Sequence, residues 1–140
     1  MVSKIITLNK KFMAINKNIN TVQDYEEVLA VVKGYVEGLK TGNVEQLKQT
    51  FHKDAVMYGH LKDGLSEGSI DNLYNYVEEF GAAANIKTHL DVLHKTSTTA
   101  IIRVEMESDA ADEDFTDYHS LIKIDRQWKV IAKLFHLYEK

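Results

Sequence analysis

The sequence predicts an α+β fold in which three N-terminal helices pack on one face of a curved antiparallel sheet. Between residues 21 and 82, apolar side chains recur at helical spacing. From Ile86 onward, apolar and polar residues alternate as they do in half-buried strands. Since 140 residues fit one domain with its own core, we expect a single domain at 21–140, preceded by an N-terminal arm or a short helix at 1–20.

The clearest helix is expected over residues 21–40. Thr21 followed by Asp24 resembles a capping box, and Gly42 is a natural C-terminal stop. Gly34 and Gly38 lower the helix propensity, which indicates that they allow close packing. The apolar residues form one stripe of an amphipathic helix, and they are Val22, Tyr25, Val28, Leu29, Val32, Tyr35, Val36 and Leu39.

The remaining elements follow from similar patterns. Asn43 can cap a short second helix at 44–51, and a third helix is expected at about 70–82. A short strand within 52–61 and a glycine-containing loop at 62–69 separate these two helices. About four strands complete the chain, within 86–95, 98–108 and, after an acidic loop at 109–114, the hairpin 115–137.

The hairpin FTDYHSLIKIDRQWKV (115–130) contains the consecutive polar residues Asp117, Tyr118 and His119. If Ile124 pairs with Trp128 across a three-residue turn at 125–127, Tyr118 faces inward and its two neighbours face outward. No acidic residue then lies on the inner face, and Asp117 is expected to pair with a neighbouring lysine. A turn that differs by one residue in length would swap the assignments of one strand.

The composition excludes several kinds of function. The formal charge of −4 argues against a nucleic-acid partner, and the absence of cysteine excludes disulfides and thiolate sites. No apolar run has the length of a membrane span or the pattern of a signal peptide, so we expect a cytoplasmic protein without a membrane partner. Metal-ligand spacings and phosphate-binding glycine motifs are absent, so neither a metal nor a cofactor is expected.

Four segments carry a resemblance to a known family: the long helix, FHKDAVMYG, DYHSLIKIDRQWKV and the closing KLFH. Together they resemble the NTF2-like superfamily and, more narrowly, its SnoaL-like branch, often labelled putative lumazine-binding proteins. The resemblance implies a cone-shaped half-barrel that encloses a pocket, and homodimers formed through the sheet. Lys53 and Arg126 stand where the family often has proline and glycine. Family members include isomerases, dehydratases, cyclases, hydrolases and binders, so the fold leaves the function open.

The inner face and the mouth of the cone supply the candidate site. Catalysis would use His136 with Tyr118, or His52 with Tyr58, as a proton-transfer group beside a hydrogen-bond donor. The expected ligand-binding residues are Tyr35, His52, Tyr58, Tyr118, Trp128 and His136. The expected homodimer interface on the outer sheet face consists of His119, Leu121, Ile131, Phe135 and Leu137.

Three functions are compatible with these residues. The first is a small-molecule-binding protein that holds an apolar or aromatic compound in the cone pocket. The alternatives are an isomerase or dehydratase that uses histidine-centred proton transfer in the same pocket, and a protein-interaction module that uses the outer sheet face.

Overall fold

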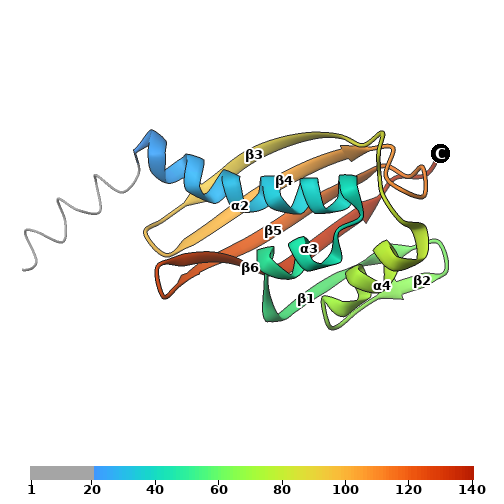
Figure 1. The fold of residues 1–140 in the computed structure, drawn as a ribbon, viewed down its shortest axis with the longest axis horizontal. Coiled ribbons are helices and arrows are strands. Elements are labelled where there is room, and N and C mark those ends of the chain that lie inside the picture. Colours follow the sequence, from blue (N-terminus) through green and yellow to red (C-terminus); the bar gives the residue numbers. More distant parts are fainter. Residues whose placement is uncertain (1–20) are drawn as a thin grey trace, which may run out of the picture.

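The computed structural model describes residues 21–140 (Figure 1). The arm or short helix predicted for residues 1–20 lies outside the described residues. The three predicted helices are confirmed. The elements are α2 (Val22–Thr41), α3 (Val44–Thr50), β1 (Phe51–Leu61), β2 (Gly64–Ser66), α4 (Asp71–Phe80), β3 (Lys87–Lys95), β4 (Thr99–Glu107), β5 (Phe115–Ile124) and β6 (Gln127–Leu137).

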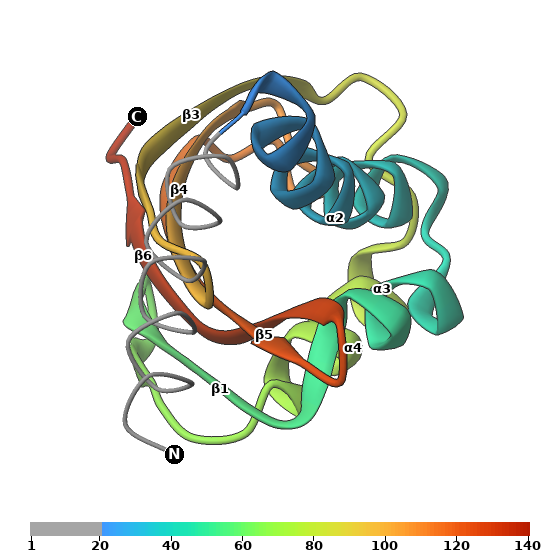
Figure 2. The same cartoon turned by 90° about the vertical axis from the view of Figure 1, so that its left-hand side faces the viewer.

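The sheet has six strands in the order β2-β1-β6-β5-β4-β3. Strands β3 to β6 form the predicted antiparallel meander, but β1 pairs with β6 in parallel, so the expectation of a fully antiparallel sheet is wrong at this pairing. The loop predicted at 62–69 contains the short strand β2. The sheet curves, and the helices α2, α3 and α4 cover its concave face (Figure 2).

Helix α2 begins and ends as its sequence predicts. The Thr21 hydroxyl accepts the backbone N–H of Asp24, while the Asp24 carboxylate accepts the backbone N–H of Thr21. Gly42 terminates the helix with φ 71°, a left-handed conformation that favours glycine. Val28 and Val32 on the buried stripe are fully inaccessible, so this helix anchors the core against the sheet.

The hairpin between β5 and β6 departs from the predicted register. Its turn has two residues, Asp125 and Arg126, with φ 49° and 67°, so Lys123 pairs with Trp128. A β-bulge at Ile131 then shifts β6 by one residue. The inner face consequently carries Asp117, His119 and Leu121 of β5, together with Trp128, Val130, Lys133 and Phe135 of β6.

The predicted faces of β5 are therefore inverted. Because strand residues alternate between faces, the two-residue turn moves Tyr118 outward, where its side chain is 39% exposed, and brings Asp117 and His119 inside. In β6, Trp128 lies on the predicted inner face because it precedes the bulge. His136 follows the bulge and lies outside.

Candidate functional site

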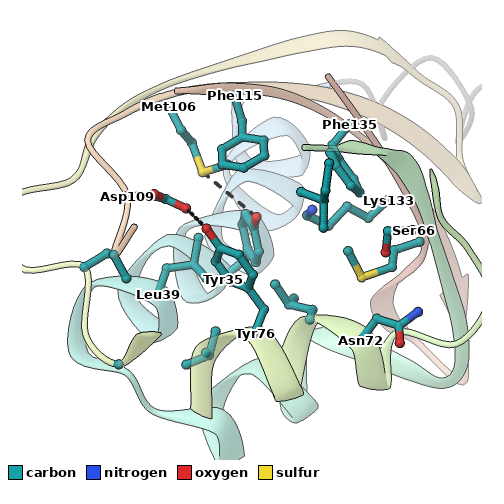
Figure 3. Close-up of a pocket in the computed structure, with 17 residues that line it drawn as sticks. Tyr35, Leu39, Ser66, Asn72, Tyr76, Met106, Asp109, Phe115, Lys133 and Phe135 are labelled. Carbon is teal, nitrogen blue, oxygen red and sulfur yellow. Dashed lines mark hydrogen bonds between the residues drawn. The ribbon is translucent and has the colours of Figure 1, made fainter. Parts of the chain in front are cut away.

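A cavity of about 60 Å³ lies between the sheet and the helices α2 and α4 (Figure 3). Its wall is mostly apolar, with Met57, Met106, Phe115 and Phe135 contributed by the sheet and Leu73 by α4. Since one water occupies roughly 10–15 Å³ on this measure, the cavity has room for about four waters or a small part of a ligand.

Tyr35 and Lys133 are the polar wall residues that connect the cavity to a buried carboxylate. Asp117 has no accessible surface and lies behind them. The Tyr35 hydroxyl donates a 2.6 Å hydrogen bond to Asp117 Oδ2, and Lys133 Nζ lies 3.7 Å from Asp117 Oδ1. His119 completes this group, with Nε2 3.4 Å from Asp117 Oδ2. We name these four residues the Asp117 cluster.

Opposing effects set the protonation of Asp117. Burial acts to raise its pKa, but the Lys133 ammonium and the hydrogen bonds from His119 and Tyr35 outweigh burial and hold the pKa below its ordinary value. Asp117 is therefore an ionised carboxylate near neutral pH. Its Oδ1 atom is buried and accepts no hydrogen bond from the described residues.

Burial shifts the pKa of each of the other cluster members toward its neutral form. Burial lowers the pKa of Lys133 and of His119, against the attraction of the Asp117 carboxylate in both cases. Burial, reinforced by Asp117, raises the pKa of the Tyr35 hydroxyl well above its ordinary value. The cluster thus contains a carboxylate that accepts protons, a phenol that donates one and an amine with an increased neutral fraction.

A second polar pair closes the cavity on the side of the acidic loop. The Tyr76 hydroxyl donates a 2.6 Å hydrogen bond to Asp109 Oδ2, and both residues line the cavity. Asp109 Oδ1 accepts the backbone N–H groups of Ala111 and Glu113, each at 2.9 Å. Because this carboxylate is fully engaged, it orders the loop, and Tyr76 links that loop to α4.

The structure separates the predicted ligand-binding residues. Tyr35 lines the cavity, whereas Trp128 is buried outside its wall. Tyr58 and Tyr118 are 43% and 39% exposed on the outer face, and His136 is exposed as well, so their predicted inward orientation is wrong. Neither predicted catalytic pair, His136 with Tyr118 or His52 with Tyr58, lines the cavity.

His52 is half-buried and does not line the cavity. Its Nδ1 atom accepts the backbone N–H of Asp54 at 3.0 Å. This bond fixes the ring at the start of β1, where it orders the local backbone.

The predicted interface also changes. His119, Leu121 and Phe135 are buried inside the chain, so their predicted outward orientation is wrong. Ile131 is 38% exposed, and Leu137 is partly buried against the core. The two-residue turn explains the inward orientation of His119 and Leu121, and the bulge at Ile131 explains that of Phe135.

Sequence reasoning missed Asp117, Lys133, Tyr76 and Asp109 as residues of the site region. A signal for β5 was present, because Phe115 and Leu121 share the alternation of Asp117 and predict that this face is buried. Ile122 and Ile124 are apolar residues on the opposite face, and they favoured the wrong prediction that this opposite face is the buried one. Nothing in the local pattern reveals Lys133, since its orientation depends on the bulge.

Neither a metal-binding group nor a membrane-spanning helix occurs among the described residues. In the part of the chain from 21 to 140, no group of three histidine, aspartate or glutamate side chains could hold a metal ion. Among the same residues, no helix has the length and apolar character needed to cross a membrane.

The fold and the cavity define a small α+β domain of the NTF2-like class. The chain belongs to the family described as “Putative lumazine-binding”, which matches residues 23–136. It is also 36% identical over 120 residues to a protein from Cladobotryum sp described as “Aldolase FrzH”, a match that covers 86% of this chain and 96% of that protein.

Solved structures support the same fold. An NTF2-like protein of unknown function from Methylobacillus flagellatus is 31% identical, with a TM-score of 0.80 and coverage of 85% of this chain and 95% of the other. A ketosteroid isomerase-like protein from Erwinia carotovora atroseptica is 14% identical, with a TM-score of 0.69 and coverage of 86% and 100%. The second similarity shows the fold alone.

Proposed function

We propose that this protein is an enzyme that binds a small, largely apolar carbonyl compound in the cavity and makes or breaks a carbon–carbon bond beside the carbonyl. The observation that carries the proposal is the buried, ionised Asp117. This carboxylate lies behind the cavity wall and contacts Tyr35 and Lys133, which are part of the wall. The proposal retains the predicted small-molecule pocket inside a cone-shaped half-barrel. It moves the chemistry from His136 and Tyr118 to the Asp117 cluster.

Such a reaction requires removal of a proton from the carbon beside the carbonyl, together with stabilisation of the oxygen that becomes negative. The oxygen of Tyr35 can take the α-proton while its own hydroxyl proton passes to Asp117 Oδ2 over the 2.6 Å hydrogen bond. Lys133 Nζ is the cationic donor at the cavity wall that can stabilise the negative oxygen. The apolar wall excludes water and strengthens both interactions.

The similarity to the protein described as “Aldolase FrzH” supports carbon–carbon bond chemistry, because the match extends over most of both chains. The same proton transfer, without a second carbonyl partner, would give an isomerase or a dehydratase. Simple binding in the cavity is the remaining alternative. These functions differ in whether the α-proton is exchanged and in whether two carbonyl molecules are joined.

Proton exchange is the direct test. The protein is incubated in heavy water with 2-butanone, and loss of the α-proton signals is followed by NMR. We expect exchange above the buffer rate, at least about tenfold slower in Asp117→Asn and Tyr35→Phe, as is typical when a general base is removed. Tyr118→Phe is the matched control and should exchange like the wild type.

Absence of exchange by the wild-type protein would contradict the enzymatic proposal. Native mass spectrometry of gently purified protein would then identify a retained ligand and favour simple binding. Equal exchange by wild type and Asp117→Asn would show that the Asp117 cluster is not the site.

We also propose that the protein forms a homodimer through the outer sheet face. Tyr58, Leu134 and Tyr118 lie opposite one another across β1, β6 and β5, and they are 43%, 57% and 39% exposed. Ile131 and Ile101 extend this apolar surface on β6 and β4. The proposal keeps the predicted face and, of the predicted residues, Ile131. We name Tyr58, Leu134 and Tyr118 the outer row.

A further inference from the structure

We propose that Lys133 is a nucleophile that binds the carbonyl carbon of the substrate covalently as an imine. This inference rests on the proposed function and gives Lys133 a covalent role in place of stabilising the negative oxygen. The substrate class consists of aldehydes and ketones that carry a hydrogen on the carbon beside the carbonyl.

The position of Lys133 follows from the bulge in β6. The extra residue Ile131 turns Lys133 toward the interior, opposite His119 on β5. Its side chain is only 5% exposed, lines the cavity and directs Nζ toward the interior (Figure 3). The nitrogen lies 4.2 Å from the centre of the Phe135 ring, so the apolar wall and the Asp117 carboxylate both contact it.

A lysine that served only to balance the charge of Asp117 would not need to reach the cavity. Lys133 does both, and Asp117 Oδ1, the oxygen nearest to Nζ, accepts no hydrogen bond from the described residues. The two carboxylate oxygens therefore have separate neighbours. Oδ2 accepts the Tyr35 hydroxyl, and Oδ1 is free to exchange protons with the lysine nitrogen.

The covalent step balances without a co-reactant. The lone pair of the neutral Lys133 amine forms the C–N bond, and the C=O π pair moves to the oxygen. Asp117 Oδ1 accepts a proton from the nitrogen and passes it to that oxygen, which becomes a hydroxyl group. The second nitrogen proton passes through Asp117 in the same way, so the hydroxyl group leaves as water and the nitrogen lone pair forms the C=N bond. Asp117, again ionised, accepts the α-proton through Tyr35, the C–H pair forms C=C and the C=N pair moves to the nitrogen. Asp117 then returns the proton to that nitrogen to give an enamine.

The surroundings favour the neutral amine that this step requires. Burial in the apolar wall lowers the pKa of Lys133, while the carboxylates of Asp117 and, at longer range, Asp109 oppose the shift. A lysine desolvated in a hydrophobic pocket is a common form of an activated amine nucleophile. Each unit by which the pKa falls gives about tenfold more free amine at neutral pH.

The test uses 2,4-pentanedione, a small diketone that condenses with a free amine to give an enaminone and one water. The enaminone absorbs in the near-ultraviolet and survives proteolysis, so the labelled lysine is identified by mass spectrometry of peptides. We expect about one equivalent on Lys133 at neutral pH, formed faster than on surface lysines, because burial lowers the pKa of Lys133 and increases its fraction of free amine. Peptide mapping of the wild type makes the result independent of how any variant folds.

Two variants sharpen the test. Lys133→Arg keeps the positive charge near Asp117 but removes the nucleophile, so the fast labelling should disappear. Lys95→Arg alters another buried lysine, which lies 5.4 Å from the Trp128 ring centre and outside the cavity wall, and should leave the fast labelling unchanged. Labelling of Lys133 no faster than that of surface lysines would overturn the inference.

The inference and the proposed function fail separately. If Lys133 is not labelled preferentially but 2-butanone exchange still depends on Asp117, the imine is wrong and the proposed function stands. If Lys133 is labelled rapidly but no ketone exchange occurs, the nucleophile stands and the proposed carbon–carbon bond chemistry is wrong.

Discussion

The Tyr35 hydroxyl donates a 2.6 Å hydrogen bond to Asp117 Oδ2, which joins the buried face of α2 to the inner face of β5. Both residues are almost completely inaccessible, and Tyr35 also packs edge-on against His119 with ring centres 4.6 Å apart. The bond therefore links helix to sheet across the core and places a charged group beside the cavity. A single contact thus contributes to the stability of the fold and, in the proposed function, to the chemistry of the site.

Replacing Tyr35 with phenylalanine should remove this bond while keeping the ring packing. Since a hydrogen bond to a charged group contributes about 1.5–3 kcal/mol, the free energy of unfolding should fall by that amount. Urea denaturation followed by circular dichroism measures the change. Tyr118→Phe, at an exposed position, should stay within about 0.5 kcal/mol of the wild type. Equal effects of the two substitutions would contradict a strong buried bond.

His119 should make the stability depend on pH below neutrality. Burial lowers the pKa of His119 in the folded state, whereas in the unfolded chain the pKa is about 6.5. As the pH falls below about 6.5, the unfolded state binds more protons, and the free energy of unfolding decreases until the pH reaches the folded-state pKa. Urea denaturation between about pH 7 and pH 5 measures the slope, and His119→Gln should reduce it. An unchanged slope in His119→Gln would contradict a buried neutral imidazole.

The helices could be predicted from the sequence because their signals are local. The capping box at Thr21 and the αL stop at Gly42 are complete within a few residues, and both occur in the structure. The orientation of Asp117 depends instead on the length of a turn eight residues away. A turn of two residues rather than three exchanges the faces of the whole strand, which explains why the fold was predicted and the site was not.

That turn contains a residue in an unfavourable backbone conformation. Arg126 adopts φ 67°, a left-handed conformation that costs a non-glycine residue roughly 1–2 kcal/mol. Arg126→Gly should relieve this strain, although added flexibility in the unfolded chain offsets part of the gain. We expect the free energy of unfolding to rise by about 0.5–1 kcal/mol in urea denaturation. Arg126→Ala keeps the unfavourable φ and is the control, and equal stability of the two variants would contradict strain at this position.

Two glycines of α2 should respond in opposite ways to alanine. A Cβ on Gly38 would lie 2.6 Å from Leu47 Cδ2 and 2.9 Å from Leu47 Cγ, so Gly38→Ala should destabilise the fold by about 1–3 kcal/mol. A Cβ on Gly34 would meet only Thr50 Oγ1, at 3.4 Å. Because alanine has the higher helix propensity, Gly34→Ala should therefore raise the free energy of unfolding by up to about 1 kcal/mol. Thermal unfolding of the pair measures both effects, and destabilisation by both would show that Gly34 is also needed for close packing.

The proposed homodimer can be tested at the centre of the outer row. Leu134 lies between Tyr58 and Tyr118 and is 57% exposed, so a charge there would enter the middle of an apolar interface. Leu134→Lys should weaken association by about 2 kcal/mol, or roughly thirtyfold in the dissociation constant, without unfolding the chain. Light scattering coupled to size-exclusion chromatography, over a range of protein concentrations, measures the shift from dimer to monomer. Val22→Lys, on α2 and 78% exposed, introduces the same charge away from the sheet and should leave the dimer intact. A wild-type monomer, or a dimer unaffected by Leu134→Lys, would contradict the outer row as the interface.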